Sequence, residues 1–101
     1  MARKIDWAET ALLHLDEIGS FIALDSPSFS ALTVSRIIAR AEQAAQFPES
    51  GRIVPEYADP ALRELFWRAY RVIYRVQAER IVIVAVVHGR RRLNDALEPD
   101  S

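Results

Sequence analysis

The stretch Leu62–Arg92, LRELFWRAYRVIYRVQAERIVIVAVVHGRRR, decides the fold, because three apolar segments with strand patterns follow one another in it. The middle segment, residues 70–76, alternates tyrosine and valine on one face with arginine and isoleucine on the other, as a half-buried strand does. The last segment, residues 80–87, is mostly β-branched and apolar, which is typical of the most buried strand of a sheet. The short polar link at residues 77–79 predicts an antiparallel hairpin, because parallel strands need a long crossover.

A short strand and an amphipathic helix are expected at the start of the chain. Residues 2–6 predict an edge strand with Ile5 as its apolar contact. Apolar residues then recur at helical spacing from residue 7 to about residue 24. Asp6 followed by Glu9 fits a capping box, in which each side chain would satisfy an unpaired backbone donor at the start of the helix.

A second helix and a loop lead from there to the sheet. Ser26 suits an N-cap and Pro27 suits the first helical turn, where its missing N–H costs nothing. We expect this helix to run to about Phe47 and to end before Pro48. Residues 48–61 contain three of the five prolines and predict an ordered loop that crosses to the sheet.

Together these elements predict an α+β fold of two layers. The order is β-α-α-β-β-β, with a helical hairpin packed on one face of a small, mainly antiparallel sheet. The alternation directs Tyr70 and Tyr74 toward the helices, and we expect the opposite face of the sheet to be open. Residues 1–93 are predicted to form one domain and residues 94–101 a polar C-terminal tail.

Composition narrows the classes of function. The 101 residues include no cysteine, which excludes disulfides, thiolate zinc sites and a cysteine nucleophile. Acidic residues interrupt the N-terminal apolar region, and no apolar run approaches the ~20 residues that span a bilayer. We therefore expect a cytoplasmic protein without a membrane partner. The two histidines lie far apart and the three glycines are scattered, so neither a metal site nor a cofactor is predicted.

The charge is unevenly distributed although the net charge is only −1. Residues 51–101 contain nine arginines, no lysine and seven acidic residues, whereas residues 1–50 contain four basic and seven acidic residues. Guanidinium groups suit a bidentate grip on carboxylate or phosphate, so a partner with acidic groups is expected. Proteins that hold nucleic acid through phosphate contacts usually show a clearer basic excess.

Several side chains are candidates for chemistry. Arg63, Arg71 and Arg90 on neighbouring strands could hold a phosphate, or could be solvated or ion-paired. His88 could act as a general acid or base, or could bond to backbone. His14 lies among leucines in the first helix and is expected to be structural. Glu56, in the long loop, has no evident partner and is expected to be solvated.

Four motifs in their order resemble one protein family: FPESGR at residues 47–52, LREL at residues 62–65, YRVIYR at residues 70–75 and VHGRR at residues 87–91. From Ile5 to Arg92 the chain is similar to the RelE/ParE superfamily of toxins from bacterial type II toxin–antitoxin modules. The resemblance implies a small toxin, encoded beside an antitoxin that wraps it and blocks its action. It leaves open a homodimer or a hetero-oligomer with the antitoxin.

The two branches of this superfamily act differently. ParE-like members inhibit DNA gyrase, whereas RelE-like members cleave messenger RNA in the ribosomal A site. The Pro-x-x-Gly-Arg loop, the Arg-Glu-Leu strand and the His-Gly-Arg-Arg ending resemble the ParE branch. The net charge of −1 and the absence of a tyrosine after Tyr74 depart from the RelE branch. A gyrase-binding toxin is the first hypothesis, with an endoribonuclease and an inactive partner-binding module as alternatives.

The candidate residues take different roles under these hypotheses. An endoribonuclease would use Arg71, His88 and Arg90 in catalysis. In a protein inhibitor, the residues that contact the target or the antitoxin would be Arg63, Trp67, Arg75, Arg91 and Arg92.

Overall fold

A computed structural model describes residues 2–89. The expectations for Arg90, Arg91, Arg92 and residues 94–101 lie outside the described residues. Seven elements follow one another within this part of the chain: β1 (Lys4–Trp7), α1 (Glu9–Ala23), α2 (Pro27–Gln46), β2 (Arg52–Ile53), β3 (Leu62–Trp67), β4 (Tyr70–Val76) and β5 (Arg80–His88).

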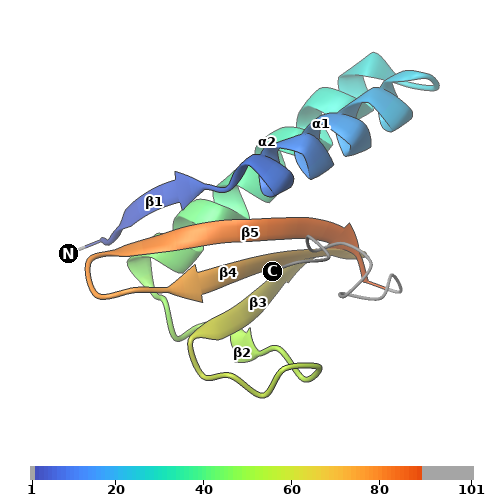
Figure 1. Ribbon diagram of the computed structural model, residues 1–101. Coiled ribbons are helices and arrows are strands. Elements are labelled where there is room, and N and C mark those ends of the chain that lie inside the picture. Colours follow the sequence, from blue (N-terminus) through green and yellow to red (C-terminus); the bar gives the residue numbers. More distant parts are fainter. Residues whose placement is uncertain (1, 90–101) are drawn as a thin grey trace.

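The elements form two layers, as predicted. The sheet has the strand order β1-β5-β4-β3-β2, in which β1 runs parallel to β5 and the other neighbours are antiparallel. The hairpin of α1 and α2 packs on one face of the sheet, and its far end projects beyond the strands (Figure 1). The α+β prediction is therefore confirmed. The two-residue strand β2 lies inside the predicted loop and is too short to give a pattern in sequence.

The main core lies between the helices and the sheet. Small residues of α2, Ala41 and Ala44, are fully buried there and allow the helix to approach the strands closely. Val72 and Tyr74 of β4 face the same core, with Tyr70 packed against it, as the alternation predicted. Burial of this apolar surface is the main term that stabilises the fold.

The second face of the sheet is covered, contrary to the expectation that it would be open. Val54, from the loop after β2, is fully buried in a second apolar cluster with Ile73 of β4. Leu62, Ala85 and Val87 complete the buried part of that cluster. The expectation failed because it treated residues 48–61 only as a connection between the helices and the sheet.

An irregularity in β5 changes which face its side chains occupy. Ile73 pairs with Ala85 and the next residue, Tyr74, pairs with Ile83, so Val84 is an extra residue on β5. Such a β-bulge shifts the alternation of side chains by one residue. Before the bulge Ile83 faces the helices, and after it Val86 does. His88, two residues beyond Val86, is thereby turned toward the helical side.

The two helix starts differ from each other. The Ser26 hydroxyl accepts a 3.1 Å hydrogen bond from the Phe29 N–H, and Pro27 begins α2, as predicted. The capping box at Asp6 is wrong, because the N-cap of α1 is Ala8, which has no side-chain cap. Strand β1 includes Asp6, whose carboxylate forms a 2.6 Å ion pair with Arg80 of β5.

Candidate functional site

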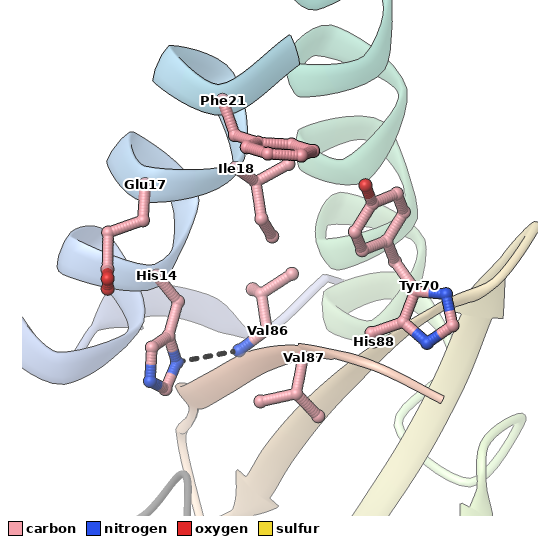
Figure 2. Close-up of a pocket in the computed structure, with 8 residues that line it drawn as sticks. All are labelled: His14, Glu17, Ile18, Phe21, Tyr70, Val86, Val87 and His88. Carbon is pink, nitrogen blue, oxygen red and sulfur yellow. Dashed lines mark hydrogen bonds between the residues drawn. The ribbon is translucent and has the colours of Figure 1, made fainter. Parts of the chain in front are cut away.

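A groove with a volume of about 280 Å³ lies between α1 and the end of β5 (Figure 2). Rings and apolar side chains from three elements dominate its surface. We call it the aromatic groove, and its lining residues are His14, Glu17, Ile18, Phe21, Tyr70, Val86, Val87 and His88.

Regular secondary structure places these side chains. Glu17 and Ile18 lie three and four residues after His14, and Phe21 lies four and three residues after them, so these side chains lie toward one side of α1. On the sheet, Tyr70 of β4 is the register partner of His88 of β5. Their rings meet edge to face, with centroids 6.0 Å apart and planes at 77°, an arrangement that aromatic pairs favour.

His14 forms the inner wall of the groove and is structural, as expected. Its side chain is 8% exposed, and its Nδ1 accepts a 3.2 Å hydrogen bond from the Val86 N–H. The pairing of β1 with β5 ends at Ile83, so the backbone of Val86 needs another partner. His14 supplies it, and an acceptor at Nδ1 requires a lone pair there, with the proton of the neutral ring on Nε2.

The rim of the groove is apolar and negative. Phe21 is 73% exposed and presents its ring to solvent at the edge of the groove. Among the described lining residues, Glu17 carries the one carboxylate, and there is no lysine or arginine. Sequence reasoning missed both residues. A phenylalanine off the apolar stripe of an amphipathic helix was the signal that could have identified Phe21.

A network of ion pairs occupies the other face of the sheet. Arg71, 5% exposed, donates from Nη1 and Nη2 to the two carboxylate oxygens of Glu56, at 2.9 and 3.0 Å. Its Nε donates to Glu64 at 2.9 Å, and Arg52 pairs with the other oxygen of Glu64. Glu64 is 1% exposed, so these guanidinium groups satisfy a buried charge.

Glu56 is exposed to solvent, as expected for a loop residue, but it also has a partner, Arg71, that the sequence did not reveal. The loop folds back on itself, because the N–H groups of Tyr57 and Ala58 both bond to the carbonyl of Val54. This turn brings the Glu56 carboxylate onto Arg71. Hydrogen bonds from Arg71 lower the pKa of Glu56, and in return hydrogen bonding to Glu56 raises the pKa of Arg71.

Of the three candidate catalytic residues, the two in the described part of the chain, Arg71 and His88, lie on opposite faces of the sheet. Arg71 is the register partner of Val87, on the face that carries the ion pairs, whereas His88 is the partner of Tyr70, on the helical face. The bulge in β5 is the cause of this separation. Arg90, the third member of the set, lies outside the described residues.

The three candidate contact residues within residues 2–89 contact other residues of this chain. Arg63 donates to the carbonyls of Gly51 and Pro60, at 3.0 and 3.1 Å. Trp67 packs half-buried against the main core, and the guanidinium of Arg68 lies 5.0 Å from its ring centre. A further ion pair, of 3.2 Å, joins Arg75 to Asp59. Arg91 and Arg92 lie outside the described residues.

Two other kinds of feature are absent from residues 2–89. No three His, Asp or Glu side chains in this range converge as ligands for a metal ion. No helix in this range is long and apolar enough to cross a bilayer.

Comparison with known proteins identifies the family. The sequence matches the family described as the ParE toxin of type II toxin–antitoxin system, parDE, over residues 5–93. It is also similar to the putative toxin Y4kP of Sinorhizobium fredii. The two sequences are 33% identical over 95 residues, which cover 91% of this chain and 95% of that protein.

Solved structures share the fold at lower identity. A chain from the chromosomal ParDE system of P. aeruginosa superposes with a TM-score of 0.71 at 21% identity, covering 86% of this chain and 96% of that one. A mutant of E. coli RelE in the free state superposes with a TM-score of 0.62 at 16% identity, covering 89% and 86% of the two chains. The chain belongs to the ParE toxin family of type II toxin–antitoxin systems.

Proposed function

We propose that this toxin stops growth by binding DNA gyrase, and that a cognate antitoxin neutralises it. The observation that carries the proposal is the match to the ParE toxin family, which extends from residue 5 to residue 93. The superposition on RelE does not decide between targets, because proteins of one fold often differ in function.

The ion pairs of Arg71 favour an activity based on binding a protein target rather than on RNA cleavage. Cleavage by a 2′-hydroxyl requires charged and acid–base groups that converge on one phosphate. Here the guanidinium of Arg71 is buried against Glu56 and Glu64, and His88 lies on the opposite face of the sheet. A phosphate could reach Arg71 only if Glu56 withdrew from it.

The aromatic groove supports a function that depends on protein contacts. Exposed aromatic side chains beside a concave surface supply most of the binding energy in many protein interfaces. Phe21 has this character, and Tyr70 and His88 line the groove beside it.

Two assays in parallel test the proposal. Purified toxin is added to a gyrase supercoiling reaction and, separately, to ribosomes translating a defined messenger RNA. We expect lost supercoiling with intact message, and recovery of supercoiling when the antitoxin is added. Cleaved message with unaffected gyrase would show an endoribonuclease instead. No effect in either assay, with no toxicity on expression without antitoxin, would indicate an inactive partner-binding module.

A further inference from the structure

We infer that the aromatic groove receives the side chain of a lysine or arginine of the cognate antitoxin. The inference rests on the proposed neutralisation by an antitoxin and adds the chemistry of one contact. It follows from the rings, the charge and the size of the groove.

The rings of the groove suit a cation. The side chains of Phe21 from α1 and Tyr70 from β4 reach toward the same space, with His88 beside Tyr70 (Figure 2). The faces of aromatic rings carry a negative quadrupole and attract an ammonium or guanidinium group within about 6 Å of the ring centre. Several rings around one space are the arrangement by which proteins recognise cationic groups.

The charge of the groove points to the same guest. Glu17 contributes a carboxylate at the rim, and it forms no ion pair with any residue of the described part of the chain. Helix α1 also carries Glu9 and Asp16 and contains no lysine or arginine. An acidic side chain would be repelled here, whereas a basic one would gain an ion pair.

The size of the groove suits one long side chain. The groove has a volume of about 280 Å³. A helix is about 10 Å wide with its side chains, so a single side chain fits inside this volume and a whole helix does not. Ile18 and Val86 lie between Glu17 and the rings of Tyr70 and His88 (Figure 2), so they offer apolar surface to the methylene groups of a lysine or arginine whose charged head reaches either the Glu17 carboxylate or the rings. The guest is therefore a basic side chain that projects from the antitoxin surface.

The first experiment measures antitoxin binding to toxin variants by calorimetry. We expect Phe21→Ala and Glu17→Gln to weaken the affinity by about 5- to 30-fold each, from the loss of a cation–π contact or an ion pair. Asp16→Asn is the matched control, because Asp16 is also an exposed acid of α1 but lines a different hollow, with Leu12 and Gly19. We expect its affinity to stay within about 2-fold of the wild type.

A double-mutant cycle then identifies the guest. Each lysine and arginine of the antitoxin is changed to glutamine and tested against wild-type toxin and Glu17→Gln. One of them is expected to lose its effect when Glu17 is also changed, because the two side chains interact directly. The inference is overturned if all toxin variants bind the antitoxin with the wild-type affinity, or if Asp16→Asn loses as much affinity as Glu17→Gln. It is also overturned if no lysine or arginine of the antitoxin is coupled to Glu17.

The outcomes separate this inference from the proposed function. If the Glu17 and Phe21 variants bind the antitoxin as tightly as the wild type does, the groove contact is contradicted. The proposals that an antitoxin neutralises the toxin and that gyrase is its target are then unaffected. An unaffected gyrase contradicts the proposed target and leaves the groove contact in place. Circular dichroism and thermal melting of each variant verify folding, which we expect to persist because both side chains are exposed.

Discussion

At the scale of single residues, Gly51 and Tyr74 join the long loop to the sheet. The Tyr74 hydroxyl donates to the Pro48 carbonyl at 2.7 Å and accepts from the Gly51 N–H at 3.1 Å. A Cβ on Gly51 would lie 2.4 Å from that hydroxyl oxygen and 2.6 Å from the backbone oxygen of Glu64. Glycine is therefore required at this position by space, which gives a physical reason for the Pro-x-x-Gly motif.

The substitution Gly51→Ala is expected to destabilise the fold by about 1–3 kcal/mol, the usual cost of an added methyl group in a tightly packed site. Urea denaturation of the purified toxin measures this change. Gly19→Ala is the matched control, because the nearest atom to its new Cβ is a side-chain carbon of Val34 at 3.3 Å. Alanine also favours a helix interior, so its change is expected to stay within about 1 kcal/mol. Equal stability of both variants would contradict the packing argument.

Single residues also show where sequence reasoning stopped. His14 could be assigned correctly, because a histidine among leucines of an amphipathic helix is usually buried. The partner of Glu56 could not be predicted, because Arg71 lies 15 positions away and meets Glu56 only after the loop has turned back. The exposure of Phe21 could not be predicted with the same ease, because it depends on how far the helical hairpin projects beyond the sheet (Figure 1).

At the scale of elements, the alternation of residues 70–76 predicted the two faces of β4 correctly. The neighbouring strand β5 is apolar on both sides, so its sequence carries no alternation that could reveal the bulge at Val84. The face of His88 depends on that bulge. For this reason the fold could be predicted from the sequence, but the separation of His88 from Arg71 could not.

The acidic residues of the loop between β2 and β3 hold it on the sheet. The stability of the fold should therefore depend on pH. Hydrogen bonds from Arg71 lower the pKa of Glu56 below its ordinary 4.5. A hydrogen bond from the Ala61 N–H, and to a smaller extent one from Arg75, lowers the pKa of Asp59 below its ordinary 3.8. Between these ordinary values and the lower pKa values of the folded state, the unfolded chain binds more protons than the folded chain. The contribution to stability is thus present above about pH 4.5 and is lost as the pH falls through the folded pKa values.

Glu56→Gln is expected to reduce this dependence on pH. At pH 7 the variant should be less stable than the wild type, because Arg71 loses a charged partner. The difference should shrink as the pH falls below 4.5, where Glu56 of the unfolded wild type, and then that of the folded wild type, becomes protonated. Chemical denaturation between pH 3 and 7 measures it, with the exposed Glu49→Gln as the control. A constant difference across this range would show that the ion pair does not hold the loop.

At the scale of the whole molecule, the two faces of the sheet have different roles. The face with the loop holds a closed network of ion pairs around Arg71 and Glu64. The helical face presents the aromatic groove, beside a hairpin that projects beyond the sheet (Figure 1). Length, composition and motif order were enough to predict this architecture and the toxin family. The target was not predictable in the same way, because ParE and RelE toxins share the fold.

The stoichiometry of gyrase inhibition tests the central claim most directly. Toxin is titrated into a fixed concentration of gyrase, well above the dissociation constant, and the remaining supercoiling activity is measured. An inhibitor that acts by binding should remove activity in proportion to the toxin added, with an end point at a fixed ratio of toxin to gyrase sites and full recovery on addition of antitoxin. Undiminished supercoiling at a large excess of folded toxin would contradict the account.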